Sequence, residues 1–292
     1  MKTSVFSQMD IIGRLIPFIR RPNVSLQKTP TPDDSVFPES GLIVMKGAVS
    51  QNDCLAAIRD YDTHETLLVK HGCPVSDSKG RNFRVNNLHM YSESLLKIGT
   101  TKSFHDVASS YFGRRSLIHT SLSYKHGSQQ VAHIDTPFFW TNPINMYIGV
   151  WVALEDVKPD AGPLFYYEGS HKYFNSVKEL TAVYEASDKN VNRMFEIMHD
   201  VVSSKCKRVE LCVNQGDAIL WHPGVMHGGT FASDRDATRY SCVYHFGAQG
   251  VNVRFQTTFP NNFLNVPLCG LSEYNGQLYA RKNMPKVIPH KD

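Results

Sequence analysis

The stretch at residues 145–171, NMYIGVWVALEDVKPDAGPLFYYEGSH, decides the fold class of this chain. It holds two runs rich in aromatic and β-branched residues, and the turn-forming residues KPDAG at 158–162 separate them. Runs of this kind, bounded by Gly, Pro, Asn and Asp, are typical of short β-strands. The stretch therefore predicts two short strands joined by a turn.

Further short runs of the same kind lie on both sides of this stretch. They are SLIHTSLSYKH at 116–126, QVAHID at 130–135, KRVELCVN at 207–214, DAILWHPG at 217–224 and RYSCVYHFG at 239–247. Many short strands at such spacing indicate a β-sandwich or barrel. We also expect a strand within 41–49, a helix at 50–61 and a helix at 102–112.

We interpret the chain as an arm followed by one domain. Residues 22–38 carry four prolines with polar neighbours, which is typical of an extended connector. Residues 1–38 are therefore expected to form an N-terminal arm and linker, and residues 39–292 a single domain that is mainly β with flanking helices. The interval 176–203 departs from the strand pattern, because its composition is typical of helices, and it predicts a helical insertion.

The composition, the net charge and the N-terminal residues limit the classes of protein to which this chain can belong. The 292 residues are 41% hydrophobic, which suffices for a substantial core. The net charge of +4 is spread along the chain, so we expect no binding to nucleic acid, which requires a concentrated basic surface. Asp10 and Arg14 interrupt the apolar N-terminal run, which predicts an arm that packs on its own domain or on a second copy in a homo-oligomer, without stable membrane insertion.

The cysteines indicate a reducing compartment. Six are present, and none forms a CxxC pair or belongs to a dense framework. Such spacing fits free thiols better than disulfides. The sequence therefore predicts a cytoplasmic protein.

The segment VAHIDTPFFWTNP at 131–143 places His133 and Asp135 two residues apart. In a strand, side chains at positions i and i+2 leave the same face, so both can bind one metal ion. His227 is the third candidate ligand, and Gly228 and Gly229 beside it allow a close backbone approach. Two imidazoles and one carboxylate form the facial triad of non-haem Fe(II) oxygenases, which leaves positions open for ligands. Zinc stays as the alternative metal.

With these motifs the chain resembles the phytanoyl-CoA dioxygenase family of Fe(II)/2-oxoglutarate oxygenases. The resemblance covers residues 40–250 and rests on H-x-D at 133–135, GVWVALEDVKPDAGPLFYYEGSHK at 149–172, and GDAILWHPGVMHGGT at 216–230 followed by Arg239. It implies a double-stranded β-helix core of the jelly-roll, cupin-like type. It also implies an iron ion held by His133, Asp135 and His227, with 2-oxoglutarate and O2 as cosubstrates.

The far carboxylate of 2-oxoglutarate requires a cation, and the resemblance assigns this role to Arg239. A guanidinium meets a carboxylate with two hydrogen bonds. Arg235 is the alternative, although it lies in the polar turn ASDRDAT, where a solvated charge is expected. Thr230 or Ser241 is expected to add a hydroxyl group to the same carboxylate.

Two further residues are assigned to the cosubstrate by the same resemblance. Gln130 corresponds to a glutamine that relatives direct toward it, and its alternative role is that of a plain amide at a strand edge. Trp151 matches a family tryptophan near the cosubstrate, and its alternative role is that of an ordinary core residue.

The substrate is expected to contact aromatic and polar residues near the metal. Phe138 and Phe139 follow the metal ligands directly, so their rings are expected to exclude water and to hold an apolar substrate, unless they cap the core instead. The segment RNFRVNNLHMYSE at 81–93 places Arg84, Asn86 and Asn87 in the region that lines the mouth of the site in the family. Of these we expect Asn87 to contact the cosubstrate or the substrate, and the choice between the two asparagines stays open.

The resemblance implies an enzyme, a dioxygenase that oxidises a C–H bond of a small-molecule metabolite and releases succinate and CO2. Hydroxylation is the default because Asp135 is the carboxylate that halogenating relatives lack; desaturation, epoxidation and rearrangement stay open. The chain shows no basic cluster for the phosphates of coenzyme A, which favours a natural-product intermediate as substrate. The alternatives are a metabolite-binding protein without catalysis and a zinc-dependent cupin-like enzyme.

Overall fold

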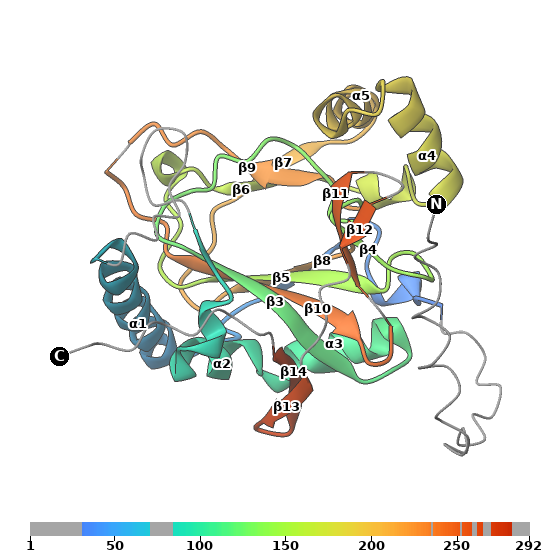
Figure 1. Ribbon diagram of the computed structural model, residues 1–292. Helices are drawn as coiled ribbons and strands as arrows, with labels where there is room; N and C mark the ends of the chain where they lie inside the picture. The colour runs from blue at the N-terminus through green and yellow to red at the C-terminus, as the bar shows by residue number, and fades with distance from the viewer. Residues whose placement is uncertain are drawn as a thin grey trace, which may run out of the picture. The chain divides into compact units, whose positions relative to one another are not determined.

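The computed structural model describes residues 31–70, 84–234, 236–251, 253–258, 262–264 and 270–281. Residues 1–30, most of the expected arm, lie outside the described residues, and so does Arg235. The described part contains one large sheet, two three-stranded sheets and several helices (Figure 1).

The elements have the following bounds. The strands are β1 Leu42–Met45, β2 Val85–Asn86, β3 Ser116–Tyr124, β4 Phe139–Trp140, β5 Tyr147–Ala153, β6 Leu164–Tyr167, β7 Arg208–Leu211, β8 Ala218–Trp221, β9 His227–Gly229, β10 Ser241–Ala248, β11 Arg254–Thr258, β12 Asn262–Leu264, β13 Gly270–Tyr274 and β14 Gln277–Arg281. The α-helices are α1 Gln51–Lys70, α2 Glu93–Gly99, α3 Lys102–Phe112, α4 Val177–Ala186 and α5 Val191–Ser203.

Two sheets face each other. The large sheet has the order β1-β8-β5-β10-β3-β14-β13, with β2 paired to β3, and a smaller sheet has the order β7-β6-β9. In Figure 1 the strands β6, β7 and β9 lie opposite β5 and β8, whereas α1, α2 and α3 cover the other face of the large sheet. This is the mainly β, jelly-roll arrangement with flanking helices that the sequence predicts.

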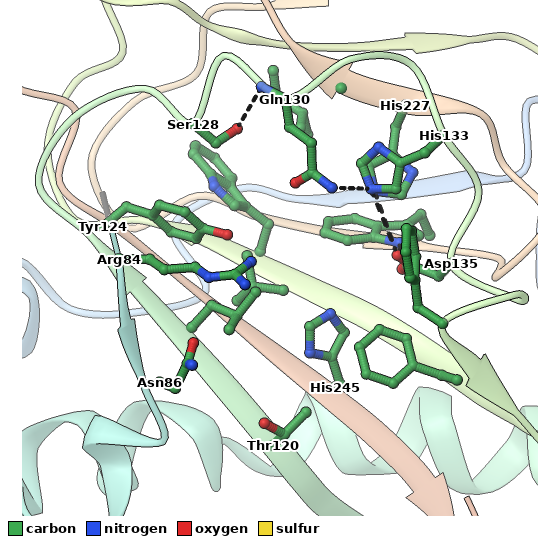
Figure 2. Close-up of a pocket in the computed structure, with 18 of the residues that line it drawn as sticks. Arg84, Asn86, Thr120, Tyr124, Ser128, Gln130, His133, Asp135, His227 and His245 are labelled. Atoms are coloured by element: carbon green, nitrogen blue, oxygen red, sulfur yellow. Dashed lines mark hydrogen bonds and ion pairs between the residues drawn. The ribbon is translucent and has the colours of Figure 1, made fainter. Parts of the chain in front are cut away.

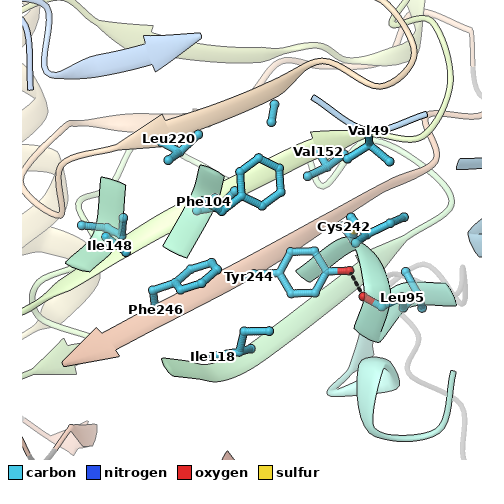
Figure 3. Close-up of a cluster of buried hydrophobic side chains, with 14 of the residues drawn as sticks. Val49, Leu95, Phe104, Ile118, Ile148, Val152, Leu220, Cys242, Tyr244 and Phe246 are labelled. Carbon is cyan, nitrogen blue, oxygen red and sulfur yellow. Dashed lines mark hydrogen bonds between the residues drawn. The ribbon is translucent and has the colours of Figure 1, made fainter. Parts of the chain in front are cut away.

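The residues of β10 alternate between the helices and the space between the sheets. Cys242, Tyr244 and Phe246 pack with Phe104 of α3 in the main core (Figure 3). The Tyr244 hydroxyl group donates a hydrogen bond to the carbonyl oxygen of Leu95 at 2.5 Å. Because successive side chains leave opposite faces of a strand, the residues between these three point away from the core. The helices thus anchor one face of the sheet, and the other face is available for a site.

Gly149 on β5 lies opposite Trp221 on β8, and no larger residue fits there. A methyl group at Gly149 would stand 2.2 to 2.5 Å from three atoms of the Trp221 ring. Gly149→Ala is therefore expected to lower the free energy of unfolding by about 1–3 kcal/mol, the usual cost of overpacking a core. Chemical denaturation measures this loss. Gly247→Ala is the control, because its nearest neighbour is Val253 Cγ2 at 3.3 Å. Equal stability of the two variants would contradict the packing described.

The structure departs from the expected elements in several places. Helix α1 continues to Lys70, beyond the expected end at residue 61. His133 forms an isolated bridge with His227 and is not part of a strand, because the chain turns at Asp135, whose carbonyl oxygen accepts hydrogen bonds from the N–H groups of Phe138 and Phe139. The strands β2, β4, β9 and β11 to β14 were not expected. Within the interval 176–203, α4 and α5 are present, and Ser176 and Glu179 form a capping box at the start of α4.

Two findings bear on compartment and redox state. Among the described residues, no helix combines the length and the apolar character needed to cross a membrane. Four cysteines within the described ranges are free thiols, namely Cys54, Cys206, Cys212 and Cys242.

Candidate active site

Backbone hydrogen bonds bring the two metal-binding segments together. The N–H group of His133 donates to the carbonyl oxygen of His227 at 2.9 Å, and the N–H group of His227 donates to that of His133, also at 2.9 Å. The N–H group of Asp135 donates to the carbonyl oxygen of Pro223 at 3.1 Å. These bonds align the H-x-D segment with the segment that precedes β9, so the three candidate ligands converge.

The ligand atoms of His133, Asp135 and His227 lie within 4.8 Å of one another, and all three residues are buried (Figure 2). Asp135 Oδ1 lies 3.9 Å from the Nε2 atom of each histidine. Within the part of the chain that the structure describes, no other group of three or more His, Cys, Asp or Glu residues meets this spacing. The donor set of two imidazoles and one carboxylate is the facial triad that non-haem Fe(II) prefers.

Hydrogen bonds orient both imidazoles. The Nδ1 atom of His133 lies 2.8 Å from the carbonyl oxygen of Val131, and that of His227 lies 2.9 Å from the carbonyl oxygen of Val225. A carbonyl oxygen only accepts, so each Nδ1 carries the proton and donates. The lone pair of each Nε2 atom therefore faces the centre of the triad, as is usual for histidines that bind a metal.

Trp221 fixes the carboxylate of Asp135, a role that the sequence analysis missed. The indole Nε1–H group donates a hydrogen bond of 2.7 Å to Asp135 Oδ2. This hydrogen bond leaves the other carboxylate oxygen, Oδ1, facing the two imidazoles. Nothing in the sequence distinguishes Trp221 from a core tryptophan, because the contact depends on how β8 lies against the turn at Asp135.

Burial sets the charges in the triad. It lowers the pKa of His133 and of His227 to about 4, with the charge of His227 adding to the effect on His133. It also raises the pKa of the Asp135 carboxyl group. Both imidazoles are thus neutral at pH 7, and their contacts with Asp135 are not ion pairs. Neutral imidazoles bind a metal ion without first losing a proton, so the set fits a divalent cation.

Arg239 lies in the same cavity, and its surroundings fit a carboxylate. Its side chain is fully buried, its Nη1 group donates to the carbonyl oxygen of Gly162 at 2.7 Å, and its guanidinium stands 5.8 Å from the Trp151 ring centre. Burial lowers the pKa of Arg239 to about 10, so it stays charged at neutral pH. The Nε group of Arg239 and the indole N–H of Trp151 lack hydrogen-bond partners in the protein. Buried donors of this kind are costly unless they find an acceptor, and a bound carboxylate supplies one.

The cavity has a volume of about 500 Å³. It brings together most of the residues singled out from the sequence, namely His133, Asp135, His227, Arg239, Gln130, Trp151, Phe138, Phe139, Arg84, Asn86 and Asn87. Its lining also contains residues that the sequence analysis did not select, namely Thr120, Leu122, Tyr124, Ser128, Leu164, Trp221, Val243 and His245.

Two expected cosubstrate residues do not line this cavity. The Thr230 hydroxyl group donates to the carbonyl oxygen of Pro163 at 3.1 Å. Ser241 is fully buried at the start of β10, and its hydroxyl group has no hydrogen-bond partner. Their expected contact with the cosubstrate carboxylate stays a prediction.

The expected substrate residues occupy different parts of the wall. The Phe138 ring lies 5.8 Å from the His133 ring, and the Phe139 ring stacks on Tyr147 at 4.3 Å. Asn87 uses its side-chain oxygen within the fold, where it accepts hydrogen bonds from the Thr120 hydroxyl group at 2.7 Å and from a backbone N–H group. Gln130 places its amide nitrogen 3.2 Å from His133 Nε2, at the centre of the site.

Comparison with known proteins agrees with this geometry. The family model for phytanoyl-CoA dioxygenase matches residues 37–236. The chain belongs to the phytanoyl-CoA dioxygenase family. Peroxisomal phytanoyl-CoA dioxygenase of Homo sapiens is 31% identical over 106 residues, covering 36% of this chain and 30% of that protein. The protein of the same name from Rattus norvegicus is 24% identical over 239 residues, covering 73% of this chain and 66% of that protein. The aligned region thus covers less than two thirds of the length of either relative.

Solved structures of similar fold extend the comparison. The non-haem α-ketoglutarate-dependent carbocyclase SnoK from nogalamycin biosynthesis has a TM-score of 0.58 at 15% identity, covering 77% of this chain and 85% of SnoK. EctD from S. alaskensis with 2-oxoglutarate and 5-hydroxyectoine has a TM-score of 0.55 at 18% identity, covering 76% of this chain and 77% of EctD. These matches confirm the double-stranded β-helix fold of this member of the phytanoyl-CoA dioxygenase family.

The hydrogen bond between Trp221 and Asp135 yields a testable prediction. Trp221→Phe retains an aromatic ring and removes the donor, so the carboxylate is no longer held with Oδ1 toward the imidazoles. Loss of such an outer partner typically weakens metal binding by about 10- to 100-fold, and we expect that loss in an anaerobic Fe(II) titration. Trp140→Phe is the control, because Trp140 is only half-buried and does not line the cavity. Unchanged Fe(II) affinity in Trp221→Phe would show that the indole does not position Asp135.

Proposed function

We propose that the protein is an Fe(II)/2-oxoglutarate-dependent dioxygenase that oxidises a C–H bond of a small molecule. One observation carries the proposal: a buried set of two imidazoles and one carboxylate shares a cavity with a buried arginine that has an unsatisfied donor. Membership of the phytanoyl-CoA dioxygenase family supports the same activity. His133, Asp135 and His227 would hold the iron ion, and Arg239 would bind the far carboxylate of 2-oxoglutarate.

The residues around the metal would orient the ligands and exclude water. Gln130 and Trp151 place amide and indole N–H groups in the cavity, where each can donate a hydrogen bond to the cosubstrate. Phe138 and Phe139 form an apolar wall beside the metal ligands, which keeps water away from a reactive centre. Iron and 2-oxoglutarate, when bound, supply the oxidation, which consumes O2 and releases succinate and CO2.

Hydroxylation of a natural-product intermediate is the reaction that we propose. The carboxylate of Asp135 stands between the two imidazoles and takes the position that a halide would need. The cavity of about 500 Å³ suits 2-oxoglutarate together with a small second molecule, and the sequence shows no basic cluster for the phosphates of coenzyme A. SnoK is a carbocyclase from nogalamycin biosynthesis, so a related fold also serves the synthesis of natural products.

Succinate release tests the proposed function. The purified protein is incubated with Fe(II), 2-oxoglutarate and O2, first alone and then with pools of candidate metabolites. We expect succinate formation that requires all three components and that rises when a substrate is present. A metabolite-binding protein without catalysis would bind a metabolite and form no succinate. A zinc-dependent enzyme would turn over a substrate without O2 and without 2-oxoglutarate, and either result would end the proposal.

A further inference from the structure

Two hydrogen-bonded side chains, Asn87 and Thr120, line the cavity and are not among the metal ligands. Both residues are buried, with 8% and 6% of their surfaces exposed. Asn87 has a left-handed backbone, with φ of 56°, and directly precedes the short helix Leu88–Met90. Thr120 lies within β3. The pair therefore places polar groups in a largely enclosed part of the cavity wall.

The hydrogen bonds around Asn87 fix the polarity of this pair. The backbone N–H group of Ser121 donates to Asn87 Oδ1 at 3.1 Å. A backbone N–H group only donates, so this atom is the oxygen of the amide. The Thr120 hydroxyl group lies 2.7 Å from the same oxygen and donates its one proton there. The remaining lone pairs of Thr120 Oγ1 can then only accept a hydrogen bond.

The amide nitrogen of Asn87 is the matching donor. Within the part of the chain that the structure describes, Asn87 Nδ2 has no acceptor and Thr120 Oγ1 receives no donor. Both residues line the cavity, and the two atoms are adjacent because each neighbours Asn87 Oδ1. The pair thus offers one donor and one acceptor, side by side, to a molecule in the cavity.

The pair lies at the end of the cavity that the cosubstrate leaves free. Thr120 pairs with His245 in the ladder between β3 and β10. Arg239 lies at the other end of this ladder, where its N–H group donates to the carbonyl oxygen of Lys125 at 2.8 Å. A strand rises about 3.3 Å per residue, so the backbones of Thr120 and Lys125 are about 16 Å apart. In Figure 2 the His245 ring lies between Asp135 and Thr120. A molecule of 2-oxoglutarate held between Arg239 and the metal ligands would therefore not reach the pair.

Apolar and aromatic groups surround the pair on the cavity wall. Leu122 and Val243, which face each other in the ladder, are the next cavity-lining residues of β3 and β10. The His245 ring lies 4.4 Å from the Phe139 ring, which in turn stacks on Tyr147. A polar group of a ligand loses its water in such surroundings, and it binds well only where the protein replaces the lost hydrogen bonds.

We propose, on the basis of the proposed function, that the substrate is a small neutral alcohol whose hydroxyl group binds between Asn87 Nδ2 and Thr120 Oγ1. A hydroxyl group donates and accepts through the same oxygen atom, so it matches the pair. A carboxylate only accepts, and it would set its lone pairs against those of Thr120. An ammonium group only donates, and it would leave Asn87 Nδ2 without an acceptor.

The position of the pair also orients this substrate. With its hydroxyl group at Thr120, an apolar body would extend along Leu122 and Phe139 toward the metal ligands. The C–H bond that is oxidised would then lie at the opposite end of the molecule from the hydroxyl group that binds.

Matched alcohols and methyl ethers test the inference. The protein is loaded with Ni(II), which does not support turnover, and with saturating 2-oxoglutarate. Hexan-1-ol and 3-phenylpropan-1-ol are then titrated beside their methyl ethers, which accept a hydrogen bond but donate none, and binding is followed by saturation-transfer NMR. We expect each alcohol to bind at least about fivefold more tightly than its ether, the effect of one neutral hydrogen bond.

Two substitutions are expected to move this preference in opposite directions. Thr120→Val removes the acceptor with little change of shape, so alcohol and ether should bind equally. Asn87→Asp retains an acceptor for the Thr120 hydroxyl group and tolerates the left-handed backbone, but it removes the donor that an ether needs, so the preference for the alcohol should rise. Thr63→Val, at an exposed position of α1, is the control and should behave as the unmodified protein does.

The contrary outcomes are distinct from one another. Equal binding of alcohols and ethers by the unmodified protein, or the absence of binding by both alcohols, would overturn the inference, as would an unchanged preference in Thr120→Val. Weaker binding of 2-oxoglutarate in Thr120→Val would assign the pair to the cosubstrate and overturn it as well. Failure of the unmodified protein to bind Ni(II) and 2-oxoglutarate, seen before any alcohol is added, would instead refute the proposed function on which the inference rests.

Discussion

Asp135→Ala is expected to abolish succinate formation and to weaken Fe(II) binding by more than about 100-fold, which exceeds the usual loss when only an outer partner of a ligand is removed. Asp135 is the one anionic ligand of the triad, and its Oδ1 atom lies 3.9 Å from both imidazole Nε2 atoms. Without it, two neutral imidazoles remain, and they do not offset the charge of a divalent ion. An anaerobic Fe(II) titration and a succinate assay measure the two effects.

The fold is expected to survive this change. Replacement of Asp135 leaves the Trp221 indole N–H without an acceptor, at a cost of about 1–3 kcal/mol, but it also removes a buried carboxyl group whose pKa is raised by burial. Asp106→Ala, at an exposed position of α3, is the control and should retain both Fe(II) binding and succinate formation. Full turnover by Asp135→Ala would remove Asp135 from the ligand set.

Arg239→Ala is expected to raise the half-saturating concentration of 2-oxoglutarate by about 10- to 100-fold, the range that hydrogen bonds to a charged group contribute. The guanidinium group is buried and fixed by Gly162 on one side and by the Trp151 ring on the other. A shift confined to the cosubstrate requirement, with turnover recovered at high 2-oxoglutarate, is the expected pattern. Steady-state kinetics with varied 2-oxoglutarate measures it.

Arg239→Lys separates charge from geometry in this prediction. Lysine retains the charge but offers no planar fork, so it should restore only part of the affinity for the cosubstrate. An unchanged 2-oxoglutarate requirement in Arg239→Ala would contradict the role of Arg239. The role would then pass to Arg235, which lies outside the described residues.

The sequence predicts the parts of the fold and site that depend on local patterns. Short β-prone runs, each bounded by turn residues, identify β3, β5, β6, β7, β8 and β10, and the helix at 102–112 coincides with α3. The H-x-D spacing predicts that His133 and Asp135 act together, and the glycines that follow His227 select it as the third candidate ligand. The strand and helix predictions succeed because neighbours in the sequence determine them, whereas the convergence of His133, Asp135 and His227 depends on backbone hydrogen bonds between segments that are far apart in the sequence.

Contacts that depend on strand register were not predictable from the sequence. Trp221 reaches Asp135 because β8 lies beside β5, where Gly149 leaves room for the indole. Tyr124 and His245 line the cavity from β3 and β10, but their own neighbours in the sequence resemble those of core residues. The selection of these side chains requires knowledge of which strand faces the metal.

The interval 176–203 contributes more to the site than its composition suggests. Phe195 of α5 places its ring 6.1 Å from His133 and 5.3 Å from Phe138. The helical insertion therefore supports the wall beside the metal ligands. A helix-like composition predicts the presence of such an element, but it does not predict the surface on which the helix packs.

An anaerobic Fe(II) titration of the unmodified protein, His133→Ala and His227→Ala, each with 2-oxoglutarate present, tests the central claim most directly. The geometry predicts that the unmodified protein binds one iron ion per chain and develops the visible absorption of iron chelated by 2-oxoglutarate, and that both variants lose the absorption. Absence of the absorption in the unmodified protein, or its persistence in either variant, would contradict the claim that His133, Asp135 and His227 hold a single iron ion.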